Sequence, residues 1–420
     1  MTRLEHVFKP AARHRIAGQV VVAALGMAAL SPIASRAAES AAESAPVRDE
    51  QAADYDKAIA EATAAIRFDP MNAGNYRRRA ETRWRKARAL SSQEEYAAGV
   101  ADCDQAIALD PDDARAYFVR GKCRHTDFTG AIQDYGRAIR LDPKYAAAYA
   151  ARGATWLENA RLSSIFSGKA TADRQYDRAI ADLSEALRLE PRDAGAWWIR
   201  GNVWTEKRQS DKAVADYVEA VRLGPEDGTY RASLADALRA AGDNDRAIAE
   251  YSEAIRLAPD NREAYEHRGD AWLAKKKFDH AVADYTQAKA FVKRREAWRA
   301  AGEFDKLLDD LGEAIRQHPK AFLAYEQIAR LFAACPEAKY RKGEKAVEYA
   351  MKACELTDWR NPVTFATLAA AYAEAGKFDE AVQWQTKAID AGGPDREMEE
   401  YRKRLDLYKQ GKAYREDPAP

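Results

Sequence analysis

The 420-residue sequence predicts an all-α protein, a right-handed α-solenoid of stacked helical hairpins, because one pattern recurs along most of the chain. Most repeats of this pattern end in a short apolar phrase closed by proline, at Pro70, Pro111, Pro143, Pro191, Pro225, Pro259 and Pro319. Most of these prolines are followed six residues later by an aromatic residue and four residues after that by alanine or glycine, as at Tyr117 and Gly121. Two alanines seven residues apart then follow, as at Ala213 and Ala220.

Each part of the pattern predicts one element of a hairpin. The aromatic and the small residue belong to a first helix, and the small residue lets a second helix approach closely. The paired alanines lie on one face of that second helix, and the proline ends it because proline cannot continue the hydrogen-bond ladder. One hairpin cannot bury its own apolar face, so successive hairpins are expected to stack.

The spacing resembles that of the tetratricopeptide repeat family. The unit that begins at Trp197 reads Trp-x-x-Arg-Gly-x-x-Trp and continues with Ala213, Tyr217, Ala220 and Pro225. The resemblance covers about residues 55–392 and is specific because it recurs. It implies an array that binds other proteins and has no catalytic residues and no cofactor.

Five segments are predicted along the chain: a signal peptide over 1–37, a flexible linker over 38–54, the repeat array over 55–292 and 293–394, and a capping helix and tail over 395–420. The N-terminus is basic, the stretch from Ile16 to Leu30 carries no charge, and small residues at Ser35 and Ala37 suit a signal peptidase. We therefore expect export to the periplasm or beyond, with no membrane span after cleavage. The alternative is a retained signal anchor.

Irregular units mark places where the array departs from its period. The first unit keeps only its second helix, over 55–68, and extra residues occur around 87–94 and 161–174. These insertions are predicted to be surface loops, and the second is a contact loop in the alternative interpretation because Ile165 and Phe166 lie at its tip. A shortened first helix is expected at 292–301, and an amphipathic helix over 397–409 is expected to cap the array.

Composition and motifs exclude several classes of function. The chain has 67 basic and 67 acidic residues, which argues against a nucleic-acid partner. It contains none of the common zinc-protease, hydrolase, dinucleotide or nucleotide-phosphate motifs, and no metal or catalytic residue is predicted. Cys103 and Cys123 are expected to meet, either as buried core residues or as a disulfide, whereas no bridge is predicted between Cys335 and Cys354.

Two charges in the pattern vary together. An arginine precedes the small residue in several units, at Arg79, Arg120, Arg152, Arg200 and Arg268, and those units carry an aspartate on the second helix. The last two units lack both charges. Because an unpaired buried arginine is costly, we predict partly buried ion pairs between helices.

Candidate binding residues follow from the resemblance, which implies that first helices line a concave groove. These residues are Arg77, Arg85, Phe118, Lys122, His125, Trp198, Asn202, Asp236, Glu266 and Asp270. The N-terminal half of this groove is predicted to be basic and its middle acidic, which would orient an extended peptide. An ordinary solvated surface is the alternative interpretation. A chaperone-tail clamp is not expected, because the neighbouring first helices do not carry the lysines and asparagines that would complete such a set with Asn202.

The sequence therefore predicts a non-enzymatic protein-interaction scaffold of the bacterial cell envelope that binds a protein or peptide in the groove. Two alternatives remain: a membrane-anchored or self-assembling tether, and an accessory carbohydrate-binding module that stacks a sugar on Trp198.

Overall fold

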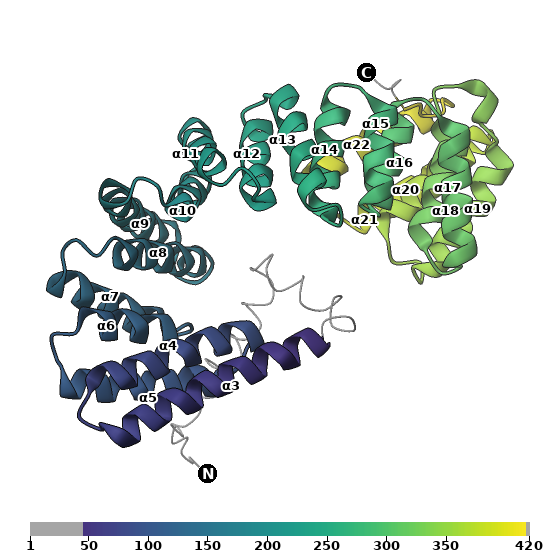
Figure 1. The fold of residues 1–420 in the computed structure, drawn as a ribbon. Helices are drawn as coiled ribbons and strands as arrows, with labels where there is room; N and C mark the ends of the chain where they lie inside the picture. The colour runs from purple at the N-terminus through teal and green to yellow at the C-terminus, as the bar shows by residue number, and fades with distance from the viewer. Residues whose placement is uncertain (1–44, 417–420) are drawn as a thin grey trace, which may run out of the picture. The chain divides into compact units, whose positions relative to one another are not determined.

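The computed structural model describes residues 45–416, and their side chains from residue 52 onward. This part of the chain forms 20 α-helices, α3 to α22, with one short 3-10 helix and no strand (Figure 1). The structure confirms the predicted all-α repeat solenoid. The predicted signal peptide lies outside the described residues.

The chain divides into two compact units at Val203 and Trp204, inside α10, rather than at the predicted boundary near residue 292. Unit 1, described from residue 45, contains α3 (Ala45–Phe68), α4 (Ala73–Leu90), α5 (Gln93–Leu109), α6 (Ala114–Cys123), α7 (Phe128–Leu141), α8 (Ala146–Phe166), α9 (Lys169–Leu189) and most of α10 (Ala194–Glu206). In this unit α4 pairs with α5, α6 with α7 and α8 with α9, so each pair forms one antiparallel hairpin.

Unit 2 repeats the same arrangement and ends in an additional helix. Its elements are α11 (Ser210–Leu223), α12 (Gly228–Ala240), α13 (Asn244–Leu257), α14 (Arg262–Ala274), α15 (Phe278–Gln287), α16 (Phe291–Ala300), α17 (Phe304–Gln317), α18 (Phe322–Ala334), η1 (Ala338–Tyr340), α19 (Gly343–Leu356), α20 (Pro362–Glu374), α21 (Phe378–Asp390) and α22 (Asp395–Lys409). The ten-residue α16 confirms the shortened first helix expected near residues 292–301.

The small residue of each first helix makes room for a large side chain of the second. A Cβ atom at Gly121 would lie 2.6 Å from the Tyr135 ring, and one at Gly269 would lie 2.7 Å from the Tyr285 ring. Both tyrosines are buried. Glycine is therefore required at these positions because the two helix backbones approach so closely.

Arginine and aspartate pair across the helices of single hairpins, as predicted. Guanidinium and carboxylate groups form two hydrogen bonds in each of four hairpins, for Arg79–Asp102, Arg120–Asp134, Arg152–Asp182 and Arg268–Asp284. Their donor–acceptor distances lie between 2.5 and 3.0 Å, and the four aspartates are buried. Two parallel hydrogen bonds fix the orientation of one helix against the other.

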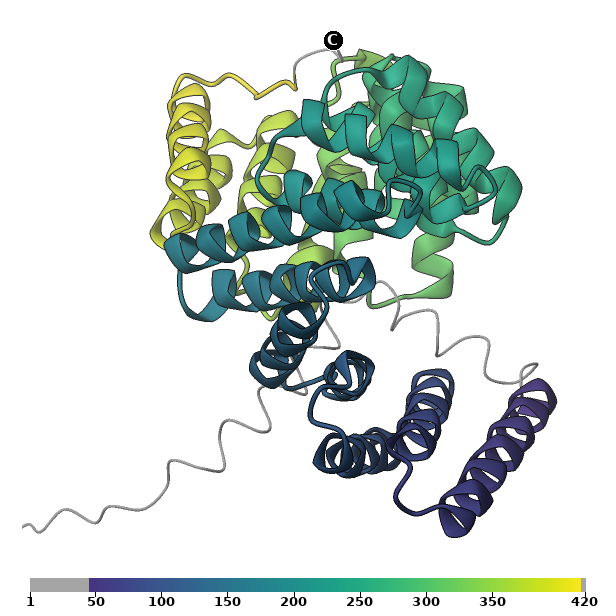
Figure 2. The same ribbon diagram turned by 60° about the vertical axis from the view of Figure 1, so that its left-hand side comes forward.

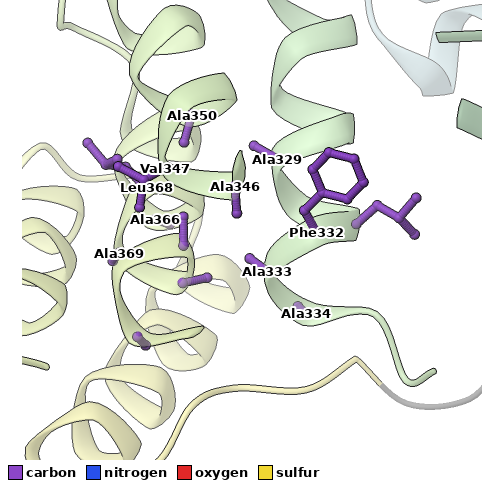
Figure 3. Close-up of a cluster of buried hydrophobic side chains, with 14 of the residues drawn as sticks. Ala329, Phe332, Ala333, Ala334, Ala346, Val347, Ala350, Ala366, Leu368 and Ala369 are labelled. Atoms are coloured by element: carbon purple, nitrogen blue, oxygen red, sulfur yellow. The ribbon is translucent and has the colours of Figure 1, made fainter. Parts of the chain in front are cut away.

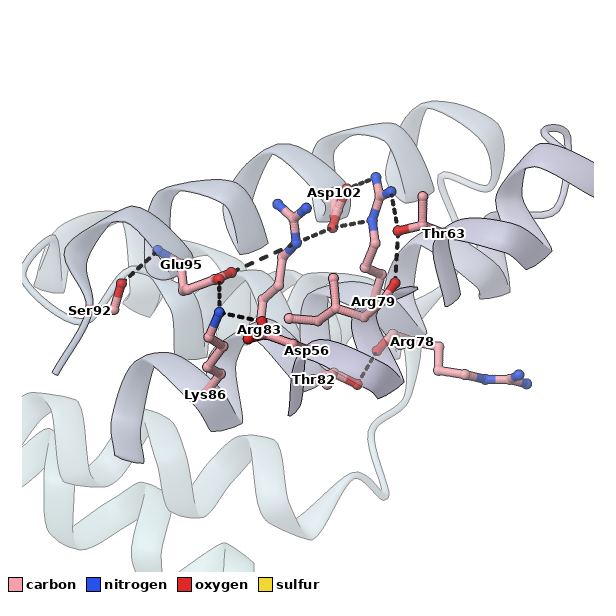
Figure 4. A network of polar contacts seen from close by, with 11 residues as sticks. Asp56, Thr63, Arg78, Arg79, Thr82, Arg83, Lys86, Ser92, Glu95 and Asp102 are labelled. Carbon is pink, nitrogen blue, oxygen red and sulfur yellow. Dashed lines mark hydrogen bonds and ion pairs between the residues drawn. The ribbon is translucent and has the colours of Figure 1, made fainter. Parts of the chain in front are cut away.

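The first hairpin extends this pairing into a network (Figure 4). Arg79 bonds Asp102 on α5 and also donates to the hydroxyl of Thr63 on α3, at 3.1 Å. Lys86 links Asp56 on α3 to Glu95 on α5, at 2.7 Å each. The lone helix α3 is therefore joined to the hairpin after it by charged hydrogen bonds.

A large cluster of buried apolar residues lies at the C-terminal end of unit 2. Small residues dominate it, with Ala329, Ala333, Ala346 and Ala369 among those in Figure 3. The terminal helix α22 packs against α21 and buries Met398, Tyr401 and Tyr408. This confirms the predicted amphipathic capping helix.

Two predictions about irregular segments differ from the structure. Helix α3 begins at Ala45, so residues 45–54 are helical where a linker was expected. The insertions lengthen helices instead of forming loops, giving an 18-residue α4 and a hairpin of two 21-residue helices, α8 and α9. Ile165 and Phe166 lie at the end of α8 and are exposed. Added turns satisfy their own backbone hydrogen bonds, which a loop of the same length would not.

The Arg152–Asp182 pair offers a test of what holds a hairpin together. Replacing Arg152 by leucine should lower the free energy of unfolding by about 2 kcal/mol or more, because Asp182 would remain buried without its partner. Urea denaturation followed by circular dichroism measures the change. The matched control is Arg188→Leu, whose arginine pairs with Glu185 on the surface of the same hairpin and should matter little. Equal stability of the two variants would contradict a stabilising role for the buried pair.

Candidate functional site

Three pairs of first helices from neighbouring hairpins lie directly against each other. Helix α4 contacts α6 in unit 1, and α12 contacts α14 and α18 contacts α20 in unit 2. We call the outward-facing surface of the first helices of one unit, with α10 and α16 counted as first helices, its first-helix surface. All of the predicted binding residues except His125 lie on first helices.

In unit 1, a lysine lies between two aromatic rings from different helices. The Lys122 ammonium of α6 lies 3.3 Å from the centroid of the Trp84 ring on α4 and 5.2 Å from that of Phe118. Burial lowers the pKa of Lys122, and the nearby Arg85 and Arg88 lower it further, while Glu81 acts in the opposite direction. We call Trp84, Arg85, Arg88, Phe118 and Lys122 the Trp84 patch.

The Trp84 patch carries more positive than negative charge. Arg85 pairs at 2.8 Å with Glu81, one turn earlier on α4. Arg88 and Lys122 have no carboxylate within ion-pair distance among residues 52–416. Arg77, two turns before Trp84 on the same helix, is already paired at 2.7 Å with Asp113, whose carboxylate also caps the N-terminus of α6. The surplus cations therefore favour an anionic ligand.

Trp84 and Arg88 were not predicted as binding residues. They lie near the C-terminal end of α4, with Arg88 inside the insertion and Trp84 just before it. The signal that was available is a tryptophan one turn after the small residue Ala80, with arginines at 85 and 88. The structure brings this extended end of α4 beside Phe118 and Lys122.

Other residues predicted in the N-terminal half have different surroundings. Phe118 is half-buried and lies 4.9 Å, ring to ring, from Tyr145. His125 follows α6 rather than lying on it and stacks on Tyr96 at 3.8 Å. Burial lowers the pKa of His125, so it adds no charge to the surface at neutral pH. Trp198 and Asn202 lie on α10 and are half-buried.

In unit 2 the predicted acidic residues are largely paired with cations. Lys293 of α16 lies 2.8 Å from both Glu266 and Asp270 of α14, and Arg239 of α12 lies 3.9 Å from Asp270. These cations come from the first helices on either side. The expected acidic middle is therefore a mixed network of charges rather than a free acidic surface.

Asp236, the third predicted acid, is held by two further side chains. Its carboxylate is 2.7 Å from Nδ1 of His267 and accepts a 2.5 Å hydrogen bond from the Tyr251 hydroxyl. The hydrogen bond to Asp236 raises the pKa of His267, against the opposing effect of burial. A protonated His267 therefore offsets the charge of Asp236.

An aromatic pocket that the sequence did not predict lies in the last hairpin. Trp359, Phe365, Trp384, Lys387 and Asp390 line an open pocket of about 610 Å³. The rings of Trp359 and Trp384 are 5.3 Å apart, and Lys387 lies 4.0 Å from the centroid of Trp384. The pocket belongs to unit 2 and has no counterpart in the predicted groove.

The described part of the chain holds neither a cluster suited to a metal ion nor a helix suited to a membrane. Residues 45–416 contain no group of three or more His, Cys, Asp or Glu side chains placed to hold a metal ion. No helix in the same range has the length and apolar character needed to cross a membrane. All four cysteines are buried free thiols, and Cys103 and Cys123 belong to one core cluster.

Family comparison agrees with the repeated hairpins. A model described as "TPR repeat" matches residues 127–159 and 235–276, and one described as "Tetratricopeptide repeat" matches residues 85–126 and 170–228. The chain is a tetratricopeptide repeat protein. Proteins of this family bind protein or peptide partners and are generally non-enzymatic, which supports a protein–protein interaction scaffold.

Solved structures of tetratricopeptide proteins are similar to part of this chain, whereas no curated protein matches it. TTC0263, a thermophilic TPR protein of Thermus thermophilus, is 21% identical over 46% of this chain and 99% of its own, with a TM-score of 0.38. YrrB, a TPR protein with an unusual peptide-binding site, is 20% identical over 48% and 95%, with a TM-score of 0.35. PilF of Pseudomonas aeruginosa is 16% identical over 53% and 97%, with a TM-score of 0.44.

The pKa values of His267 and His125 should lie on opposite sides of the ordinary histidine value of 6.5. We expect NMR titration of ¹³C-labelled histidines to place the pKa of His267 above 6.5 and that of His125 below it. Protonation of His267 then stabilises the folded chain fully below pH 6.5, and this contribution is lost as the pH rises through the folded-state pKa. For His125 the sign is reversed, and stability falls as the pH drops below 6.5.

The substitution Asp236→Asn separates the effect of the Asp236 carboxylate on a histidine pKa from the effect of burial. It should return the pKa of His267 toward 6.5 and leave that of His125 unchanged, because burial, and not this carboxylate, lowers the pKa of His125. A His267 pKa that did not respond would contradict the assigned hydrogen bond.

Proposed function

We propose that this protein is an exported, non-enzymatic scaffold of the cell envelope that binds an extended acidic peptide of a partner protein on the first-helix surface of unit 1. The Trp84 patch carries the proposal, because it combines half-buried aromatic rings with cations that have no carboxylate partner among the described residues. Aromatic side chains supply apolar contact area, and the cations favour carboxylates. The family's use of such arrays for protein binding supports the same function.

The geometry suits an extended peptide better than a compact ligand. Arg77, Trp84 and Arg88 are spread along α4, while Phe118 and Lys122 lie on the adjacent α6. A peptide lying over both helices would contact the rings of Trp84 and Phe118, with an arginine of α4 on either side of Trp84. Since the array is preorganised, little conformational entropy of the protein is lost on binding.

The envelope location is supported by the N-terminal sequence alone. The basic start, the uncharged stretch from Ile16 to Leu30 and the small residues before residue 38 together favour export. In the anchored alternative the same segment would be retained and would tether the scaffold to the membrane.

Charge reversal in the Trp84 patch tests the binding surface. Arg88→Glu with Lys122→Glu should weaken binding of an acidic peptide about tenfold or more, since it removes the cations that have no carboxylate partner among residues 52–416. Fluorescence anisotropy of a panel of labelled peptides measures this, each peptide being paired with a version in which glutamine replaces glutamate. The control variant, Arg188→Glu with Arg222→Glu, reverses two exposed cations of second helices. Equal binding of the Glu and Gln peptides would show that charge plays no part.

The N-terminus of the mature protein tests the location. After fractionation of native cells, mass spectrometry of the purified protein should find a chain that begins near residue 38 outside the inner membrane. A chain that keeps residues 1–37 and sediments with the membrane would instead establish the anchored tether.

A further inference from the structure

The chain after α22 turns back and lies across the first helices of unit 2. Helix α22 ends at Lys409, and Gly411 takes a φ of 69° in the turn that follows. The backbone N–H of Glu416 then donates a 2.9 Å hydrogen bond to the carbonyl of Ala334, at the end of α18. Figure 3 shows this yellow segment passing beside Ala334, and Figure 2 shows it leaving the end of α22.

The side chain of Glu416 is bound by two arginines from different first helices. Its carboxylate lies 2.9 Å from Arg299 of α16 and also contacts Arg330 of α18. The side chain is only 15% exposed. Arg330 lies on a first helix, α18, so the tail contacts the same kind of surface that a partner peptide is expected to use.

The residue before Glu416 makes the opposite ion pair on the next first helix. The guanidinium of Arg415 lies 2.6 Å from the Glu374 carboxylate of α20. Tyr414 adds a cation–π contact, with its ring 4.0 Å from the guanidinium carbon of Arg404 on α22. Within three residues the segment Tyr414–Arg415–Glu416 therefore makes one cation–π contact, one ion pair with a carboxylate and two ion pairs with arginines.

The arginines are poorly compensated without the tail. Burial and the neighbouring Arg330 lower the pKa of Arg299, whereas Glu416 and the more distant Glu326 act in the opposite direction. Glu326 is itself buried and accepts a 2.8 Å hydrogen bond from Thr367. Departure of the tail would leave two adjacent guanidinium groups that favour another carboxylate, since the Arg299 side chain is only 22% exposed and an unpaired buried charge is costly.

We propose that Arg299, Arg330 and Glu374 form a second peptide-binding site, on the first-helix surface of unit 2, and that the chain's own tail occupies it. The partner that fits is an extended segment with a basic residue directly followed by an acidic one, as in Arg415–Glu416. Such a peptide binds only where the tail has left, so the tail limits access to the site. The proposal concerns unit 2 and does not depend on the Trp84 patch.

Binding of the tail sequence in trans tests this site on the full-length chain. The probe is a fluorescein-labelled peptide of residues 411–420 with an amidated C-terminus, so that no terminal carboxylate mimics Glu416. In the variant Arg415→Gln with Glu416→Gln the tail is present but loses its ion pairs with Arg299, Arg330 and Glu374. This variant should bind the probe at least tenfold more tightly than the unaltered chain in fluorescence anisotropy. Adding Arg330→Gln should abolish the gain.

Matched controls separate the site from a general charge effect. Glu399→Gln with Lys403→Gln removes an exposed pair on α22 and should leave the site occupied by the tail. A probe that carries Glu416→Gln should lose at least tenfold in affinity for the released chain.

Several outcomes would overturn the proposal: no gain on release, equal binding of both probes, or a gain that survives Arg330→Gln. Circular dichroism decides whether the tail is displaceable at all, using the milder Glu416→Gln alone beside the double variant. If both variants unfolded, the tail would be a permanent part of the fold and the site would not exist as a binding site.

Discussion

Close approach of the two helices in each hairpin is the constraint on which the rest of the structure depends. At Gly121 and Gly269 even one added carbon would collide with a buried tyrosine, so the backbones have a single separation and register. That register places arginine and aspartate opposite each other, and their paired hydrogen bonds hold it. Once the inner faces are used in this way, the outward-facing residues of the first helices remain available for a ligand.

The two units use this common architecture with different charge balances. In unit 1 the first helices present more cations than the neighbouring carboxylates can pair, and aromatic rings surround Lys122. In unit 2 the corresponding helices supply both signs, so Lys293 and Arg239 offset Glu266 and Asp270. One fold therefore carries surplus cations in one place and a paired network of charges in another, because the outward positions are free to vary.

The C-terminal tail shows a different way of balancing charge on the first helices, because a residue from outside the repeats supplies the counter-charge. Arg299 and Arg330 lie on separate first helices, and a carboxylate from outside the repeats joins them. A solenoid exposes such positions by its construction, since each hairpin covers only its neighbours. Whatever supplies the carboxylate also removes the repulsion between the two guanidinium groups.

The sequence by itself determined the helices, the hairpins and the ion pairs within them, because these depend on spacings of a few residues that recur in most units. It also placed Arg77, Lys122 and Asp270 on first helices. Only the tertiary structure decided their surroundings: Trp84 beside Lys122, Lys293 beside Asp270, and Glu416 between Arg299 and Arg330. The physical reason is that each of these contacts joins different helices or the returning tail, and depends on how hairpins stack rather than on any local period.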